Sequence, residues 1–328
     1  MNIAFYDTKP YDRIWFDVYS KEMGFPIKFF EDRLTTDTAI LSRGCDVACV
    51  FVNDRVDAKI IDALLDQGIK LLALRSAGYN NVDLQAAFGK LPIVRVPNYS
   101  PCAVAEHAIA LLLSVNRKTH RAYVRTRDNN FSINGLMGTD LCGKTVGVVG
   151  TGRIGKIFAS VMRGFGTKVV AYDVYPDYKS GLDYVSLDEL CEVSDVISLH
   201  CPLTPETFHM INADTIGKMK DTAILINTSR GALIDTDALL EGLKNRELGG
   251  AGLDVYEEEE EYFFEDRSND IIADDDLARL LSFPNVLITS HQAFFTREAM
   301  QEIARVTMGN IAAFRKGEAL KNEVVWQP

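Results

Sequence analysis

The stretch Thr145-Val-Gly-Val-Val-Gly-Thr-Gly-Arg-Ile-Gly155 decides how the rest of this chain is interpreted. Its β-forming residues 146–149 lead into Gly150, Gly152 and Gly155, which follow the spacing G-x-G-x-x-G. Apolar residues then recur at steps of three and four, at Ile154, Ile157, Phe158, Val161, Met162 and Phe165. Such spacing is typical of the buried stripe of an amphipathic helix. The stretch therefore predicts a strand, a glycine turn and a helix, the context in which this motif binds a dinucleotide.

The three glycines and a later acidic residue predict which parts of the dinucleotide are contacted. The first glycine permits the tight turn, the second lets the backbone approach a pyrophosphate, and the third lets the helix pack on the strand. The pyrophosphate then lies on free N–H groups at the positive end of the helix. A second strand at residues 168–172 ends at Asp173, where a carboxylate is expected to accept hydrogen bonds from the adenosine ribose. We therefore predict an NAD site that includes Gly150, Gly152, Gly155 and Asp173.

Composition favours a soluble globular protein of about two domains. The chain has 328 residues, of which 47% are hydrophobic and 25% are charged. Its net charge of −11 argues against a nucleic-acid partner and against anionic membrane surfaces. No apolar run reaches the roughly 18 residues of a membrane-spanning helix, and the N-terminus does not have the pattern of a signal peptide. We expect a cytoplasmic protein with no membrane partner.

The cysteines argue against disulfides and against a metal site. All six are scattered, mostly among apolar residues, and none forms a C-x-x-C pair: Cys45, Cys49, Cys102, Cys142, Cys191 and Cys201. This pattern is typical of buried, reduced thiols in a cytosolic protein. We predict no bound metal.

The first hundred residues alternate strand-like and helix-like segments. Strands are predicted at residues 3–6, 47–52, 71–74 and 93–96. Between them, Asp54 is a candidate N-cap for a helix with an apolar face at Ile60, Ile61, Leu64 and Leu65. The alternation predicts a parallel sheet with helices on its faces, and the lack of a glycine fingerprint marks a separate α/β unit.

The chain is expected to leave this first unit near residue 100 and to return to it near residue 296. Ser100 suits a helix N-cap and Pro101 suits the first helical position. The following residues 104–113 are apolar nearly all round, as in a helix buried between two layers or two domains. A last helix from Thr296 to about Phe314 has apolar positions that need another surface, for which the first unit is the candidate.

The rest of the cofactor unit contains further predicted strands, at residues 196–199, 223–226, 251–255 and 286–289. The chain then becomes acidic from Glu257 onward, a density of like charge that is usually found in a solvated loop.

Three positions just beyond these strands carry side chains suited to catalysis. His291 follows the last strand, where ligands of open α/β sheets bind, and a histidine there can exchange a proton near neutral pH. Arg230 follows residues 223–226, and a guanidinium can hold a carboxylate through two parallel hydrogen bonds. Asp254 ends the next strand. Residue type and position leave a structural histidine and a loop-capping arginine open as alternatives.

A carboxylate partner for His291 is expected in the acidic run, but spacing cannot choose one of the residues 257–261, which are all glutamates. Such a partner favours the charged imidazolium. The remaining histidines lie in or beside helix or strand patterns and suit structural roles: His107, His120, His200 and His209.

Several motifs resemble those of the D-specific 2-hydroxyacid dehydrogenases. Residues 227–232 resemble the family's NTSRG motif, residues 252–257 its GLDVYE segment, and residues 201–207 its CPLTPET turn. Together these motifs are highly specific, and the resemblance extends over essentially the whole chain.

Within this family, the chain is most similar to the D-lactate dehydrogenase branch. The similarity lies in residues 75–83 (RSAGYNNVD), residues 291–294 (HQAF) and the acidic stretch of residues 257–272. Ser76 and Tyr79 depart from the Cys and Phe often found in that branch, which bears only on fine substrate preference.

The resemblance implies roles for individual residues. Arg230 would bind the substrate carboxylate and polarise the keto group, His291 would be the acid–base residue, and Glu259 would be its partner. The backbone N–H groups of Ala77 and Gly78 would bind the carboxylate, with Tyr99 and Phe294 around the substrate side chain. Beyond the glycines, the cofactor would be lined by Arg153, Ile154, Asp173, Cys201, Pro202, Thr207, Thr228, Ser229 and Asp254.

The resemblance also implies the fold and the activity. It implies two doubly wound parallel-sheet α/β domains, with a Rossmann NAD-binding domain of residues 100–295 inserted into a flavodoxin-like substrate domain of residues 1–99 and 296–328. The implied reaction is the NADH-dependent reduction of pyruvate to D-lactate by a homodimer. The alternatives are a D-2-hydroxyisocaproate or phenyllactate dehydrogenase and, in another class, an NAD-sensing binding protein.

Overall fold

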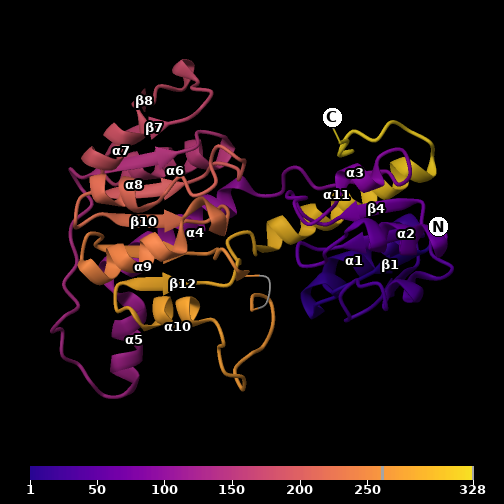
Figure 1. Cartoon of the computed structure of the whole chain (residues 1–328), viewed down its shortest axis with the longest axis horizontal. Helices are drawn as coiled ribbons and strands as arrows, with labels where there is room; N and C mark the ends of the chain where they lie inside the picture. The colour runs from indigo at the N-terminus through magenta and orange to yellow at the C-terminus, as the bar shows by residue number, and fades with distance from the viewer. Residues whose placement is uncertain (260–261, 327–328) are drawn as a thin grey trace. The chain divides into compact units, whose positions relative to one another are not determined.

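Figure 1 shows the chain as a computed structural model, which describes residues 1–259 and 262–326. The structure divides into two compact units. Unit 1 consists of Met1–Ser100 and Phe295–Pro328, and unit 2 consists of Pro101–Phe294. Glu260 and Glu261 of the acidic run, and the last two residues of the predicted substrate domain, lie outside the described residues.

Unit 1 is built on a five-stranded parallel sheet of order β2-β1-β3-β4-β5. Its strands are β1 Ile3–Phe5, β2 Ile27–Phe29, β3 Val47–Val50, β4 Leu71–Leu74 and β5 Ile93–Val94. Its helices are α1 Pro10–Met23, η1 Ala39–Ser42, α2 Ala58–Asp66, α3 Leu84–Ala87 and α11 Arg297–Arg315. β3 and β4 are buried along their whole length, because parallel strands carry helices on both faces of the sheet. The strand order is that of the flavodoxin-like folds, as predicted.

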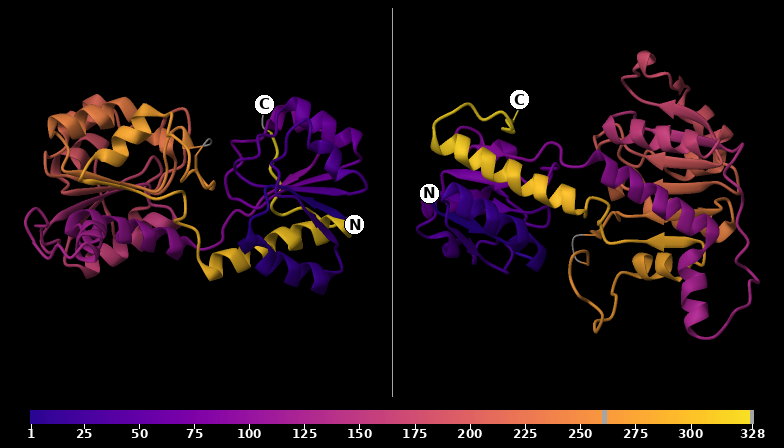
Figure 2. Two further views of the ribbon diagram at one scale, coloured as in Figure 1. Left: turned by 90° about the horizontal axis from the view of Figure 1, so that it is seen from below. Right: turned by 180° about the vertical axis from the view of Figure 1, so that it is seen from behind.

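Helix α11 completes unit 1, although it comes from the far end of the chain. Thr296 caps its first turn by accepting the N–H of Ala299. The buried side chains Met300, Ile303 and Ile311 lie on one face of the helix, which packs against α1 and β4. Figure 2 shows α11 running along unit 1 in both views. The expected packing of the last helix on the first unit is confirmed.

The predicted N-cap at Asp54 is wrong. Asp57 caps α2 by accepting the N–H of Ile60, three residues later than expected. The Asp54 carboxylate is instead fully buried and accepts the N–H groups of Phe51 and Leu34. Val56 keeps the chain extended between the two aspartates, because it forms a bridge to Val82.

Unit 2 contains a seven-stranded parallel sheet of order β12-β11-β10-β9-β6-β7-β8. Its strands are β6 Thr145–Val149, β7 Lys168–Tyr172, β8 Asp183–Tyr184, β9 Val196–Leu199, β10 Ile224–Asn227, β11 Gly250–Leu253 and β12 Val286–Ile288. Its longer helices are α4 Pro101–Arg117, α5 Thr119–Arg127, α6 Arg153–Gly164, α9 Thr236–Asn245 and α10 Asp275–Ser282, and its shorter ones are η2 Tyr178–Ser180, α7 Leu187–Val193, α8 Ala213–Lys218 and η3 Gly231–Leu233. The strand order reverses beside β6, which is the Rossmann arrangement.

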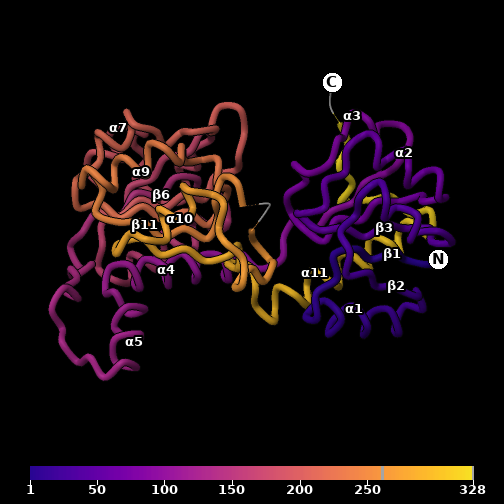
Figure 3. The backbone as a smooth tube through the Cα atoms, turned by 60° about the horizontal axis from the view of Figure 1, so that its bottom comes forward, coloured from indigo at the N-terminus to yellow at the C-terminus, as the bar shows by residue number. Residues whose placement is uncertain are grey.

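Helix α4 lies within unit 2, and α5 leaves it. The apolar residues of α4, among them Ala108, Leu111 and Leu112, are buried against α6, β10 and β11. Helix α5 has no buried residue, and the segment from α5 to β6 extends from unit 2 as an arm (Figure 3).

The cysteines are all free thiols, and three are buried as predicted: Cys45, Cys49 and Cys191. Burial raises the pKa of Cys49 to about 12, so this thiol stays protonated and inert. Cys102 and Cys142 are exposed, so the prediction of buried thiols is wrong for these two.

Candidate functional site

The glycine turn lies between β6 and α6, at the carboxyl end of the unit 2 sheet. Gly150 has a φ of +89°, and a Cβ there would lie 2.6 Å from the backbone nitrogen of Cys201. A Cβ on Gly155 would lie 2.0 Å from the carbonyl oxygen of Gly150. Only glycine fits these two positions, because one needs a left-handed backbone and both need close contact with neighbouring backbone.

Gly152 differs from the other two glycines because the space above it is open. A Cβ there would meet no atom within 4 Å. Gly152 is the N-cap of α6, and no side chain caps this end of the helix. The first N–H groups of α6, beginning at Arg153 and Ile154, therefore meet the requirement for binding a pyrophosphate.

Asp173 follows β7 directly beside the turn. Its carboxylate accepts the Thr151 N–H at 2.6 Å, the Thr151 hydroxyl at 2.8 Å and the Tyr175 N–H at 2.9 Å. Partial burial opposes ionisation, but these hydrogen bonds outweigh it and hold the pKa of Asp173 below its usual range. The side chain is therefore a fixed anion at the place where a ribose is expected.

The predicted residues after β9 form a closed turn. The Thr207 hydroxyl donates to the carbonyl of Pro202 at 2.8 Å and accepts the N–H of Thr204 at 2.8 Å. Cys201 is half-buried at the start of this turn, and its backbone contacts Gly150 as described above.

Thr228 and Ser229 follow β10. The Ser229 hydroxyl donates to the carbonyl of Leu199 at 2.9 Å, which ties the ends of β9 and β10 together. The Thr228 hydroxyl is buried and has no hydrogen-bond partner among the described residues. Because a buried hydroxyl normally has a partner, an orphaned one beside the predicted NAD site fits a bound cofactor that supplies it.

Arg230 is half-buried directly after Ser229, and its Nη1 donates to the Ser229 carbonyl at 2.6 Å. The next residue, Gly231, packs against the turn that carries the acidic run. A Cβ on Gly231 would lie 2.1 Å from the carbonyl carbon of Tyr256. The loops after β10 and β11 are therefore in direct contact.

His291 and Glu259 form a hydrogen-bonded pair. The Nδ1 atom of His291 lies 2.6 Å from Oε1 of Glu259, and the second carboxylate oxygen accepts the N–H of Tyr256 at 2.9 Å. Both side chains are mostly buried, with 19% and 17% exposed. Glu259 therefore fixes the ring orientation of His291, which leaves Nε2 to exchange a proton with a ligand.

Asp254 holds the turn on which His291 lies. Its carboxylate is fully buried and accepts the Gln292 N–H at 2.9 Å, the Ala293 N–H at 2.7 Å and the Thr289 hydroxyl at 2.6 Å. His291 itself has a φ of +52°, a conformation that costs free energy for a non-glycine residue. The hydrogen bonds to Asp254 stabilise that strained turn.

Burial alone would raise the pKa of Asp254, but hydrogen bonds from His107, Thr289 and Ala293 lower it below the usual range. The predicted cofactor contact of Asp254 stays a prediction, since both of its oxygens serve this turn.

The predicted substrate residues lie in both units. Ala77 and Gly78 follow β4 in unit 1, where the Ala77 carbonyl accepts Nη1 of Arg95 at 2.8 Å and the Gly78 carbonyl accepts the Ser76 hydroxyl at 2.8 Å. Tyr99 of unit 1 is half-buried, and Phe294 of unit 2 is 7% exposed.

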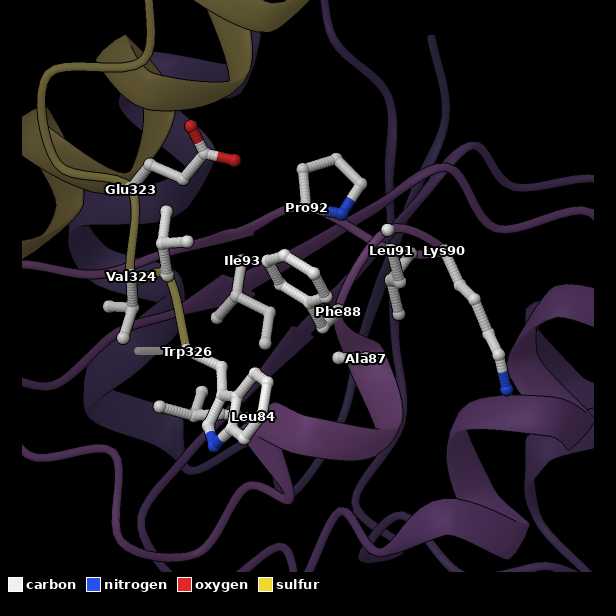
Figure 4. A pocket seen from close by; sticks show the side chains of 12 residues that line it. Leu84, Ala87, Phe88, Lys90, Leu91, Pro92, Ile93, Glu323, Val324 and Trp326 are labelled. Carbon is white, nitrogen blue, oxygen red and sulfur yellow. The ribbon is translucent and has the colours of Figure 1, made fainter. Parts of the chain in front are cut away.

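A cavity of about 220 Å³ lies elsewhere in unit 1 (Figure 4). It is bounded by α3, the start of β5 and the C-terminal segment, with Phe88 and Trp326 among its lining residues. None of the predicted site residues lines it. In the described part of the chain, no group of His, Cys, Asp and Glu could hold a metal ion, and no helix is long and apolar enough to cross a membrane.

Sequence reasoning missed several residues that hold the site together. Thr151 lies inside the glycine motif, but its bonds to Asp173 depend on tertiary structure. His107 contacts Thr289 at 3.0 Å and Asp254 at 3.3 Å, and its only signal was a polar side chain in an apolar helix. The backbone of His200 lies against Gly150 and its ring atom Nδ1 is buried; desolvation lowers the pKa of His200 to about 3, so the ring stays neutral.

Comparisons with known proteins agree with this geometry. The model of the D-isomer specific 2-hydroxyacid dehydrogenase, NAD binding domain, matches residues 109–293. D-lactate dehydrogenase of Escherichia coli (strain K12) is 48% identical over 330 residues, which cover 99% of this chain and 100% of that protein. The apo-structure of the Escherichia coli enzyme superposes with a TM-score of 0.91 at 46% identity, covering 99% of this chain and 100% of the other. A structure described as the pyruvate reductase of Chlamydomonas reinhardtii superposes with a TM-score of 0.93 at 45% sequence identity, covering 98% of each chain.

Proposed function

Because the chain belongs to the D-isomer specific 2-hydroxyacid dehydrogenase family and contains its NAD binding domain, we propose that it is an NAD-dependent D-lactate dehydrogenase that reduces pyruvate. The observation that carries the proposal is the His291–Glu259 pair, held at 2.6 Å in a loop that follows the NAD-domain sheet. Pyruvate is an anion, and a chain of net charge −11 needs a local cation to bind it. Arg230, in the neighbouring loop, is that cation in this proposal.

In this proposal, the open N-terminus of α6 at Gly152 and the fixed carboxylate of Asp173 hold the cofactor, which supplies a hydride when bound. Arg230 binds the substrate carboxylate through two parallel N–H donors of its guanidinium group and polarises the keto oxygen. Protonated His291 donates a proton to that oxygen from Nε2, while Glu259 stabilises the imidazolium. In this proposal, the N–H groups of Ala77 and Gly78 also bind the substrate carboxylate.

The test is kcat/KM with NADH across 2-keto acids of increasing side-chain length, followed by D- and L-hydroxy acids in the reverse direction. We expect the optimum at pyruvate, because the family resemblance assigns two bulky rings, Tyr99 and Phe294, to the substrate side chain, and such rings favour a methyl group over longer ones. One misfitted methylene costs about 1–3 kcal/mol in an apolar pocket, so the decline should be graded. Tyr99→Leu should shift the preference toward 2-ketoisocaproate. An optimum at 2-ketoisocaproate or phenylpyruvate in the wild type would favour the related dehydrogenases, and binding of NADH without turnover would favour a sensor.

We also propose that the protein is cytoplasmic and that two copies associate through unit 2 as a homodimer. The arm after α5 exposes large apolar side chains, including Ile133 at 82% and Met137 at 86%. Exposed apolar residues at this density indicate a protein-binding surface. Sedimentation should give a dimer, and Ile133→Asp with Met137→Asp should give a monomer. A wild-type monomer at assay concentrations would contradict the proposed assembly.

A further inference from the structure

Unit 2 contains a second histidine–glutamate pair beside the first. The Nε2 atom of His209 lies 2.7 Å from Oε1 of Glu257, and Oε2 of Glu257 accepts the hydroxyl of Thr236 at 3.2 Å. Asp235 lies 3.9 Å from the other ring nitrogen of His209. Both members of the pair are partly buried, with 29% and 24% exposed. Glu257 is therefore fixed from two sides, although it belongs to a run of like charges.

The backbone of His209 is fixed as firmly as its ring. Its N–H donates to the carbonyl of Ala232 at 2.9 Å, and its own carbonyl accepts the side-chain amide of Asn212 at 3.0 Å. His209 has a φ of +49°, a left-handed conformation that the surrounding contacts must stabilise. The ring of Phe208 stacks on its imidazole with centroids 3.9 Å apart.

This pair lies where three loops of the candidate site meet. His209 follows the Thr207 turn at the cofactor side by two residues. The N–H of His209 donates to the carbonyl of Ala232, which lies two residues after Arg230. This hydrogen bond joins His209 to the Arg230 loop. Glu257 precedes Glu259 by two residues in the same turn. Glu259 also accepts the N–H of Tyr256, the residue just before Glu257. The hydrogen bond to Glu257 joins His209 to the Glu259 turn, which Gly231 and the Thr236 hydroxyl contact as well.

We propose that the His209–Glu257 pair is a positioning device for the reaction. It fixes the turn of residues 256–259 against the Arg230 loop and so sets the distance between Glu259 and His291. His209 and Glu257 touch no reacting atom in this role; they act through Glu259 and Arg230. The inference rests on the proposed function, because it assigns the pair to the same reaction.

The physical basis is that a carboxylate held by hydrogen bonds to two side chains, as Glu257 is by His209 and Thr236, has little freedom to move. Without the His209 contact, Glu257 would keep only the Thr236 hydroxyl at 3.2 Å, and the like charges of Glu258 and Glu259 would favour a more open turn. A misplacement of about 1 Å at a catalytic group can cost roughly a hundredfold in rate. NADH affinity should change little, since Gly152 and Asp173 lie on other loops and the Thr207 turn is closed by its own hydrogen bonds to Pro202 and Thr204.

The experiment compares His209→Asn and Glu257→Gln with the control Glu258→Gln. Asparagine tolerates the left-handed backbone of residue 209, so the variant should fold. Glu258 is exposed, and its substitution removes the same charge one residue away. We expect kcat/KM for pyruvate to fall about ten- to a hundredfold in both test variants, with little change in NADH affinity. The pH at which pyruvate reduction declines should move lower, and the double variant should be no worse than either single one.

An independent readout is the downfield proton of the short His291–Glu259 hydrogen bond in the NMR spectrum. It should broaden or shift in both test variants and stay in place in Glu258→Gln. An unchanged proton and kcat/KM within about twofold of wild type would overturn the proposal, as would additive losses in the double variant. If the wild type reduces no 2-keto acid, the proposed function fails, and the proton signal still tests the pair.

Discussion

Asp173 should decide the choice of cofactor. Its carboxylate is kept ionised by Thr151 and Tyr175, so it would accept hydrogen bonds from the ribose of NADH and repel the 2′-phosphate of NADPH. Asp173→Ala should lower the ratio of kcat/KM for NADH over NADPH by at least about tenfold, or about 1.4 kcal/mol. The measurement is steady-state kinetics with both cofactors. Equal efficiency with NADPH in the wild type would rule out this role for Asp173.

Glu259 should control the pH dependence through His291. Reduction needs a protonated imidazole, so pyruvate reduction should decline with rising pH as that proton is lost. Glu259→Gln removes the carboxylate 2.6 Å from Nδ1, which favours the charged ring, and should move that decline to lower pH. The profile of kcat/KM against pH checks this. A shift in Glu258→Gln with none in Glu259→Gln would show that the wrong glutamate was chosen.

Arg230→Lys should be severe although the charge is kept. An ammonium cannot make two parallel hydrogen bonds to a planar carboxylate. We expect a higher KM for pyruvate and a lower kcat, with a combined loss of about a hundredfold or more. Arg246→Lys, at an exposed position of the same unit, is the control. Near wild-type kcat/KM in Arg230→Lys would remove Arg230 from the substrate site.

At the scale of a single element, the turn that carries His291 depends on Asp254. Its pKa is lowered, so the stability it contributes is fully present above the ordinary carboxyl pKa of about 4 and is lost as pH falls through the lower folded value. Asp254→Asn loses one acceptor oxygen and leaves a buried N–H or hydroxyl unpaired. We expect a loss of about 1.5–3 kcal/mol in the free energy of unfolding at neutral pH.

Chemical denaturation of the wild type and Asp254→Asn at several pH values checks this prediction. The gap between the two proteins should be constant at neutral pH and should narrow below about pH 4. Thr289→Val removes only one donor to Asp254 and should cost less. A difference in unfolding free energy between wild type and Asp254→Asn that increases in acid would contradict a lowered pKa for Asp254.

Most elements could be predicted from the sequence, because buried parallel strands are continuous apolar runs. The predicted strand at Leu71–Leu74 is identical to β4, and the one at Lys168–Tyr172 to β7. The edge strands β2 and β8 were missed, since they have only three and two residues and are partly exposed. The Asp54 error has a related cause: which of two aspartates caps a helix depends on a bridge to a distant segment.

The candidate site was less accessible to sequence reasoning than the fold. Glycine spacing and strand ends located the cofactor turn, Asp173, Arg230 and His291, because local pattern determines these. Which glutamate faces His291 is set by the Tyr256 N–H and by His209, contacts that arise only after the loops fold. The role of Glu259 therefore rested on family resemblance and stays a prediction, with its position against His291 in support.

On the scale of the whole molecule, unit 1 is made of two segments and unit 2 of one. The surface of α1 and β4 that α11 covers is formed by residues that precede unit 2 in the chain. A chain without α11 would leave that apolar surface in water, whereas residues 101–294 contain every strand of their own sheet.

The discontinuity of unit 1 has a consequence for synthesis on the ribosome. Translation runs from the N-terminus, so α1 and β4 emerge early but must wait for α11, which is made after every element of unit 2. Unit 2 has meanwhile left the exit tunnel complete, and we expect it to fold first, against the usual order in which N-terminal domains lead. Limited proteolysis of stalled nascent chains of increasing length would show this, with protection of unit 1 appearing only after residue 315 is released. Until then we expect the nascent segment of unit 1 to bind chaperones. Protection of unit 1 from proteolysis before α11 is released would contradict this order.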